Sequence, residues 1–533
     1  MASLAVKAFD DILWKQCIQP NLGILLFALC VSCILFLRRW PKRTLPPGPP
    51  PLPLLGNIHQ TPSKDMWKTY KQWHDKYGPI ISMQYGQKTV VSIGSFKVCK
   101  DLLDKRSTSY SSRPQLIVAN YMNRGLHSGF LLYGERLKAH QALHAVILNP
   151  RVVKSYGYVQ DIESRQLLHD ILQSRGHGFQ DIIHRYTYSA VFTLAYGKRF
   201  ASVDDETILK VDEMAEAVAE NLQKPSFLIV EAFPFLDRLP RLLAPWRRMG
   251  DHHYEETSQL FESLLQLGRS TSSWNWSKEL SKSNDERDAL SDTELAFVLG
   301  TLVEGNSTAD KILEFFIMAC VLHQPEFHHA QREIDTVVGT DRLPDCSDAP
   351  DLPYVNAFIQ EVVRWRPITP LGIPHALVKD DEYRGYHIPK GATIMANNWA
   401  MELDDELFPD ASEFRPERWL QTPNLPTAAF GFGKRSCPGQ HLGRRSLFIV
   451  VSRLLWGFNI QHACDENGQK FEIDSSKVTQ SSLTGPLPFE ASFIVRSPRH
   501  QDIIENQFSN SEKNPDAIMD HVHSLVKSAS GRL

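Results

Sequence analysis

The chain has 533 residues, and its 58 lysines and arginines nearly balance 61 aspartates and glutamates, giving a formal net charge of −3. Because the body also lacks a basic run, this balance argues against nucleic acid as a partner. The length would allow several average domains, but no linker divides the middle of the chain. The eight cysteines lack the spacing of a disulfide framework, which suits a reducing compartment.

The segment from Gln16 to Leu37 carries no charged residue and is long enough to span a bilayer, which takes about 20 apolar residues. A cationic cluster follows at once, at Arg38, Arg39, Lys42 and Arg43. Such a cluster keeps the C-terminal side in the cytosol. No small-residue cleavage site follows the span, so residues 1–43 are predicted to be an uncleaved signal anchor. We therefore expect a single-pass transmembrane helix in the endoplasmic reticulum membrane, with a cytosolic body.

Residues 44–57 form a proline-rich hinge after the anchor, and most of its prolines lie between Leu45 and Pro53. Such a run favours stiff polyproline and holds the body off the membrane. The body beyond it is predicted to be mostly helical, above all between Gly134 and Arg364. Alternating segments predict strands at Ile80–Tyr85, Val90–Ile93 and Phe489–Val495.

Two polar segments interrupt or follow this pattern. Residues 269–292 are the most loop-like interior stretch. Beyond His500 the chain is polar, and Pro515–Lys527 is predicted to form one short amphipathic helix after an Asn514 cap.

Glu361 and Arg364 lie three residues apart in a segment with helical periodicity, so they share a helix face and can form an ion pair. An exposed surface pair would give the same spacing. The pattern alone does not separate these two interpretations.

A glycine-rich loop near the C-terminus holds Cys437, between Phe430 and Gly439. Its glycines allow close backbone approach to a flat ligand and turns that other residues cannot adopt. Backbone N–H groups directed at the cysteine would stabilise its thiolate. A thiolate in such a loop suits an iron atom, because a donating axial sulfur favours O–O cleavage.

This loop resembles the haem-binding motif of the cytochrome P450 family, F-x-x-G-x-R-x-C-x-G, which it matches at Phe430, Gly433, Arg435, Cys437 and Gly439. The resemblance extends from about Leu45 to Arg499 and is closest to the microsomal, filamentous-fungal secondary-metabolism branch. It implies a mostly α fold with small β-sheets (α+β). It also implies heme b with Cys437 as the axial thiolate. The haem-thiolate domain would then cover residues 58–500, with a polar C-terminal tail over 501–533.

The resemblance assigns roles to two further groups of residues. It implies that Glu361 and Arg364 join Arg418, in Phe414–Trp419, in a buried charge network around the haem pocket. It also implies that His375, at the end of Gly372–His375, and Arg435 neutralise the haem propionates. A carboxylate inside a protein needs such charged or hydrogen-bonding partners.

One helix departs from the family pattern. The family carries W-x-x-x-R near the haem, and its arginine binds a propionate, whereas this chain has Leu137 and Gln141 at those positions. The substitutes offered by the same segment are Lys138, His140 and His144.

The central helix departs as well. Gly300–Asp310 resembles the oxygen-binding segment A/G-G-x-D/E-T-T/S, whose acid–alcohol pair delivers protons. Here no acid directly precedes a threonine, so we expect a relay through Ser307, Thr308 and ordered water, with Glu304 one turn earlier. The alternative is that both hydroxyls merely accommodate a kinked helix.

These features imply a haem-thiolate monooxygenase that uses O₂ and electrons from a separate NADPH-cytochrome P450 reductase, since no convincing dinucleotide motif is present. We expect a small apolar substrate, aromatic or polyketide-type, undergoing hydroxylation, ring closure or phenol coupling. The predicted pocket lining is Leu116, Val118, Phe227, Phe233, Leu302, Gly305, Ile368, Leu371 and Leu483. A thiolate-haem isomerase or dehydratase and a non-catalytic haem sensor are the alternatives.

Overall fold

The computed structural model describes residues 44–223, 225–285, 290–422, 424–480 and 483–530. The anchor predicted over residues 1–43 lies outside this range. Within it, no helix combines the length and the apolar character that a membrane crossing requires.

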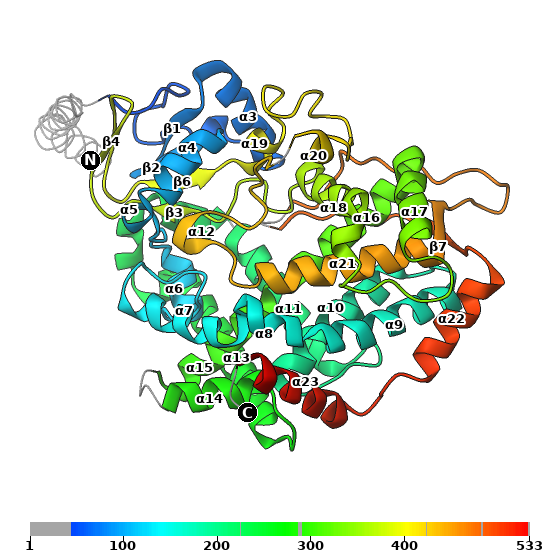
Figure 1. Ribbon diagram of the computed structural model, residues 1–533. Coiled ribbons are helices and arrows are strands. Elements are labelled where there is room, and N and C mark those ends of the chain that lie inside the picture. The colour runs from blue at the N-terminus through cyan, green and yellow to red at the C-terminus, as the bar shows by residue number, and fades with distance from the viewer. Residues whose placement is uncertain (1–43, 224, 286–289, 423, 481–482, 531–533) are drawn as a thin grey trace, which may run out of the picture. The chain divides into compact units, whose positions relative to one another are not determined.

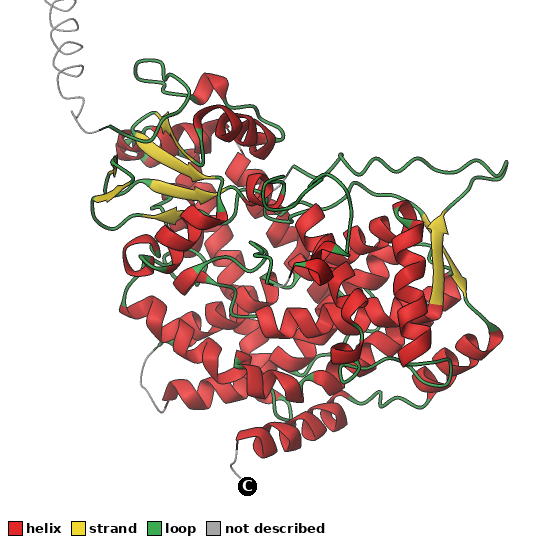
Figure 2. Cartoon of the chain, turned by 45° about the horizontal axis from the view of Figure 1, so that its top comes forward, coloured by secondary structure: helices red, strands yellow, loops and turns green. Residues whose placement is uncertain are grey.

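Helices make up most of the described chain, as the sequence predicted (Figures 1 and 2). The α-helices are α3 (Met66–Tyr77), α4 (Phe96–Cys99), α5 (Ser107–Tyr110), α6 (Ile117–Asn123), α7 (Glu135–Leu148), α8 (Pro150–Ser155), α9 (Gly157–Ser174), α10 (Phe179–Tyr196), α11 (Glu206–Gln223), α12 (Pro225–Ala232), α13 (Pro245–Ser270), α14 (Trp276–Asp285), α15 (Asp292–Glu304), α16 (Ser307–Leu322), α17 (Gln324–Val337), α18 (Pro353–Trp365), α19 (Asn398–Glu402), α20 (Arg418–Gln421), α21 (Gln440–Gly457), α22 (Pro498–Ser509) and α23 (Pro515–Ser530). Short 3₁₀ or π turns are η2 (Ile58–Gln60), η3 (Lys100–Asp104), η4 (Pro234–Arg238), η5 (Arg241–Leu243), η6 (Ala349–Asp351) and η7 (Gly433–Arg435).

The chain divides into two compact units, of which the smaller comprises Met1–Pro46 and Asp380–Ile388. In its described part, β4 (Asp381–Tyr383) and β5 (Tyr386–Ile388) form an antiparallel hairpin. The two turn residues, Arg384 and Gly385, both have positive φ, at 53° and 79°. This is the backbone that a tight two-residue hairpin turn requires.

The larger unit, Pro47–Lys379 and Pro389–Leu533, contains a four-stranded sheet in the order β1-β2-β6-β3. The two strands predicted near the N-terminus are confirmed as β1 (Ile80–Tyr85) and β2 (Lys88–Ile93), which pair antiparallel. Strand β6 (Thr393–Ala396) pairs parallel with β2, and β3 (His375–Ala376) pairs antiparallel with β6. This pairing brings His375 into the sheet although almost 300 residues separate it from β1.

A second, two-stranded sheet joins β7 (Phe458–His462) to β8 (Ala491–Val495), within the segment predicted to alternate. Strand β7 continues directly from α21, whose residues from Leu447 to Gly457 are all buried. Helix α21 packs against α9, α16, α17 and α18 in the largest apolar cluster (Figure 1). The cysteine loop is therefore attached to one of the most deeply buried helices.

The polar stretch 269–292, predicted to be a loop, contains helix α14, so this prediction was wrong. The Lys278 N–H donates to Asn275 Oδ1 over 3.1 Å, which satisfies an N–H at the start of the helix. Trp276 and Leu280 are buried on its inner face. Packing of these two apolar side chains stabilises the helix. Two residues are too few to give the sequence a recognisable helical periodicity.

The helix predicted after Asn514 is confirmed as α23. Asn514 Oδ1 accepts a hydrogen bond from the Asp516 N–H over 2.9 Å. Ile518, Met519 and Val522 are buried in an apolar cluster to which α8 and α9 also contribute. This face ties the last helix to the body.

His184 on α10 links three helices, because it lies between Asp212 of α11 and Asp310 of α16. Its Nε2 and Nδ1 atoms are 2.9 and 3.0 Å from those carboxylates. Burial lowers the pKa of His184, but the two carboxylates outweigh burial and raise the pKa to about 9. The imidazolium is therefore charged at neutral pH and bonded on both sides.

Candidate active site

Cys437 lies in the turn between η7 and α21. Its N–H donates to the Phe430 carbonyl over 2.8 Å, which closes the loop. Burial raises the pKa of Cys437, while the Gly439 N–H donates to the sulfur and lowers it. A backbone donor aimed at sulfur stabilises a thiolate, so the loop can hold one.

Gly433 is the position in this loop that demands glycine. Its φ is +55°, and a Cβ there would come within 2.1 Å of the Leu103 carbonyl oxygen. Its N–H also donates to Asp104 Oδ1 over 2.7 Å. This contact holds the loop against η3.

Arg435 points away from the loop toward three backbone carbonyls. It donates to Ser111, Ser128 and Leu131. Each of these is a neutral acceptor, so the guanidinium gains hydrogen bonds without an opposing charge.

A second arginine, Arg113, shares this environment and was not predicted. It is buried and donates to the carbonyls of Gly129, Ile373 and Pro374 over 2.9, 2.8 and 2.6 Å. The next residue along the chain, His375, has its Nδ1 atom 2.8 Å from the Tyr110 carbonyl. We call Arg113, His375 and Arg435 the cationic cluster.

The cationic cluster is short of negative charge. Burial and the nearby Arg435 lower the pKa of Arg113 to about 9, and burial lowers that of Arg435 to about 10. Burial followed by the charge of Arg113 lowers the pKa of His375 to about 3, although the Tyr110 carbonyl opposes this. None of the three contacts a carboxylate among the described residues. The cluster therefore suits a ligand with anionic groups.

Helix α7 contributes no cation to this cluster. Gln141 donates to the Lys434 carbonyl over 2.7 Å, and Lys138 pairs with Glu135 on the surface. His140 lies between Ser128 and Glu294, at 2.8 and 2.9 Å. Burial lowers the pKa of His144 to about 4. Of the three proposed substitutes, Lys138 and His140 are thus engaged elsewhere.

The central helix is broken, and a kink at this place was one of the two interpretations of the sequence. Helix α15 ends at Glu304 and α16 begins at Ser307. The Asn306 N–H bonds to the carbonyl of Val303, three residues back rather than four. The Ser307 and Thr308 hydroxyls donate to the carbonyls of Glu304 and Gly305 over 3.0 and 2.9 Å. Such side-chain bonds compete with the helical ladder and account for the break.

Glu304, the last residue of α15, binds a histidine that the sequence did not indicate. Its Oε2 lies 2.8 Å from Nε2 of His127, in the loop between α6 and α7. The two residues are 177 positions apart, so no local pattern could have paired them. Glu304, Ser307 and Thr308 all lie at the break, and their catalytic role stays a prediction.

The charge network predicted around Glu361 is present and buried. Arg364 donates to both Glu361 oxygens over 2.8 and 2.7 Å, and Arg418 donates to Oε1 over 3.1 Å. Trp419 adds an indole N–H at 2.9 Å. All three charged side chains are at most 3% exposed, so the surface-pair alternative is excluded. Removing one partner would leave a buried charge unpaired, at a cost of about 3–5 kcal/mol.

The residues predicted to line a pocket lie in several clusters. Val118 and Phe227 meet in a buried cluster between α6 and α12. Leu302 packs against a different cluster, and Ile368 belongs to the largest one.

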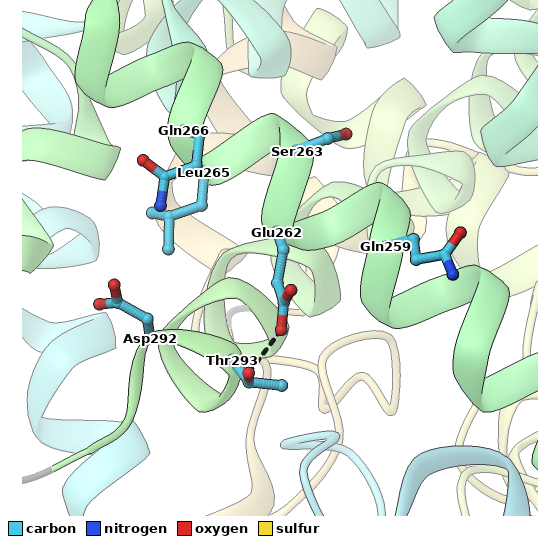
Figure 3. A pocket seen from close by; sticks show the side chains of 7 residues that line it. All are labelled: Gln259, Glu262, Ser263, Leu265, Gln266, Asp292 and Thr293. Atoms are coloured by element: carbon cyan, nitrogen blue, oxygen red, sulfur yellow. Dashed lines mark hydrogen bonds between the residues drawn. The ribbon is translucent and has the colours of Figure 1, made fainter.

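A polar hollow of about 470 Å³ lies elsewhere, between α13 and α15 (Figure 3). Its lining residues are Gln259, Glu262, Ser263, Leu265, Gln266, Asp292 and Thr293. It contains none of the predicted site residues.

Comparison with known proteins identifies the family of this chain. A family model described as Cytochrome P450 matches residues 46–491. The chain belongs to the cytochrome P450 family. Cytochrome P450 monooxygenase peniB of Penicillium patulum is 45% identical over 89% of each chain. Cytochrome P450 monooxygenase FrzL of Cladobotryum sp is 42% identical over 94% of this chain and 97% of its own.

The predicted relationship to fungal secondary-metabolism enzymes is thereby confirmed. Cytochrome P450 monooxygenase aneD of Aspergillus aculeatus is a further relative, at 43% identity over 92% of this chain and 95% of its own. The chain is a haem-thiolate monooxygenase and an oxidoreductase, and its family cofactor is heme b bound through a cysteine thiolate.

The residues present fit that cofactor. Haem has two carboxylate side chains, and the cationic cluster offers two guanidinium groups without an opposing carboxylate, beside the neutral imidazole of His375. Cys437 supplies a sulfur that already receives a backbone N–H. The donor set therefore matches a group with an iron and two carboxylates.

If Arg113 neutralises a carboxylate of haem, Arg113→Gln should weaken haem retention. The amide keeps some hydrogen bonds but carries no charge. We expect faster haem transfer to apomyoglobin, with Arg113→Lys intermediate. Arg366→Gln is the matched control, because Arg366 is also a largely buried arginine but donates to Ser475. Equal transfer rates for wild type and Arg113→Gln would contradict the assignment.

Proposed function

We propose that this monooxygenase oxidises a small, apolar secondary metabolite of aromatic or polyketide type, by hydroxylation, ring closure or phenol coupling. The observation that carries the haem assignment is the cysteine loop beside an anion-deficient cationic cluster. The substrate class is supported by apolar residues such as Val118 and Phe227, which the structure buries together. The fungal origin of the relatives supports it too.

We propose that Cys437 holds the haem iron within the loop formed by Phe430, Gly433 and Gly439. Arg113, His375 and Arg435 would hold the two haem carboxylates. When bound, haem supplies oxidation of the substrate by activated oxygen. The chain's own part is to fix the sulfur, to neutralise the carboxylates and to manage protons.

Proton supply is assigned to the break between α15 and α16. Because the hydroxyl protons of Ser307 and Thr308 are donated to carbonyls, their oxygens are left as acceptors for water. Glu304 can take a proton from solvent, since its side chain is 27% exposed. The three residues would then form a short path for protons from carboxyl to water to hydroxyl.

The electron donor is proposed to be a separate NADPH-cytochrome P450 reductase, since the chain has no convincing dinucleotide motif. The charge-free span from Gln16 to Leu37 supports a membrane anchor in the endoplasmic reticulum, with the body in the cytosol.

The first test is turnover. Microsomes containing the enzyme and a reductase should convert one member of an aromatic polyketide library to an oxygenated or oxidatively cyclised product only with NADPH, as read by product mass. Cys437→Ala should abolish turnover and the 450 nm band of the reduced carbonyl complex expected of the family. Product formation without NADPH from a peroxidised substrate would favour the isomerase alternative.

The second test concerns the membrane. A variant lacking residues 1–43 should leave the microsomal pellet for the supernatant, because the charge-free, apolar span from Gln16 to Leu37 is removed. Fractionation followed by immunoblotting measures this. Protection of the body from protease in intact, right-side-out microsomes would contradict the cytosolic orientation.

The third test concerns protons. Thr308→Ala should raise the hydrogen peroxide released per NADPH consumed, because reduced oxygen is lost when protons arrive late. Substrate affinity and the 450 nm band should not change. A tenfold loss of coupled turnover would correspond to about 1.4 kcal/mol.

Thr336→Ala is the matched control for that test. Thr336 makes the same kind of hydroxyl-to-carbonyl bond in α17, to Arg332 over 2.8 Å. If Thr308→Ala and Glu304→Gln both leave coupling unchanged, the proton path is wrong.

A further inference from the structure

We propose that His127 is a positioning residue for proton delivery: it holds one oxygen of Glu304 and leaves the other to carry the proton. This inference rests on the role proposed for Glu304. The two residues come from different parts of the chain, the α6–α7 loop and the end of α15.

The tautomer of His127 follows from its two contacts. Its Nδ1 accepts the Gly129 N–H over 3.0 Å, so this nitrogen must keep its lone pair. The neutral ring then carries its proton on Nε2. That N–H donates to Oε2 of Glu304 over 2.8 Å. The pair is thus a directed hydrogen bond with the carboxylate as acceptor.

The same contacts argue against His127 as a proton shuttle. A shuttling imidazole gives a proton from one nitrogen and takes one up at the other. Here the second nitrogen faces a backbone N–H, which cannot release its proton. His127 therefore fixes Glu304, and protonation takes place at Oε1, the oxygen it does not hold.

The loop that carries His127 is itself held in place. The carbonyls of Ser128, Gly129 and Leu131 accept hydrogen bonds from Arg435 and Arg113. The Ser128 hydroxyl also bonds to His140, which in turn bonds to Glu294 of α15. His127 is consequently a rigid support for Glu304, as a positioning residue must be.

Other titratable groups face this pair from neighbouring helices. His253 on α13 and both Tyr188 and Tyr196 on α10 interact electrostatically with Glu304, and His140 on α7 does so with His127. His253 bonds instead to Thr257, at 3.2 Å. Among the described residues, His127 is the side chain within hydrogen-bond distance of the Glu304 carboxylate.

The first experiment measures coupling in full-length enzyme with a reductase and NADPH. His127→Leu should release several-fold more hydrogen peroxide per NADPH, with unchanged substrate affinity. His127→Gln should restore coupling, because its amide N–H can stand in for Nε2–H. His253→Gln is the matched control and should couple like wild type.

A double variant separates this inference from the proposed function. If His127 acts through Glu304, adding His127→Leu to Glu304→Gln should produce no further loss of coupling. Uncoupling by Glu304→Gln but not by His127→Leu would overturn the inference and leave the relay standing. Unchanged coupling in Glu304→Gln would overturn both.

The second experiment does not depend on turnover. This experiment uses NMR of ¹⁵N-histidine-labelled enzyme as its reduced carbon monoxide complex, which is diamagnetic. The signal that is lost in His127→Leu should report a neutral ring protonated at Nε2. That signal should shift in Glu304→Gln and not in His253→Gln. A ring protonated at Nδ1, or an imidazolium at neutral pH, would overturn the proposal.

Discussion

Positive charge without an opposing carboxylate is the constraint around which this site is arranged. Arg113 and Arg435 are held by neutral carbonyls, and these carbonyls come from three separate segments, at residue 111, at residues 128–131 and at residues 373–374. Each segment must be in place before either guanidinium can be buried, because a buried charge without hydrogen bonds is costly. The surrounding fold therefore satisfies the hydrogen bonds of both guanidinium groups, but among the described residues it places no carboxylate in contact with either of them.

One loop contacts both the buried arginines and the residues at the helix break. The carbonyls that hold the arginines belong to the same short loop as His127, which holds Glu304 at the helix break. The residues proposed to balance the cofactor charge and to admit protons are thus supported by one loop between α6 and α7. A change in this loop would affect both, although neither Cys437 nor Thr308 lies in it.

Local patterns predicted the parts of this protein whose physics is local. The glycine-rich loop around Cys437, the hairpin β1–β2 and the cap at Asn514 each depend on neighbours in sequence. The network of Glu361 was found because the family motif supplied Arg418. Arg113 and His127 were missed because their partners are distant: Ile373 is 260 positions from Arg113, and Glu304 is 177 from His127. A kinked central helix was one of two interpretations left open, because the sequence does not show whether the Ser307 and Thr308 hydroxyls bond to backbone carbonyls or to water.

Helix α23 lies beyond residue 491, where the family match ends, yet Ile518, Met519 and Val522 share an apolar cluster with α15. The boundary drawn by homology is therefore not the boundary of the folding unit. A fragment cut after β8 would keep every residue of the candidate site but expose the apolar surface that α23 covers. Such surface promotes association between copies. Expression of this enzyme as a homology-trimmed domain would consequently be limited by solubility before it was limited by chemistry.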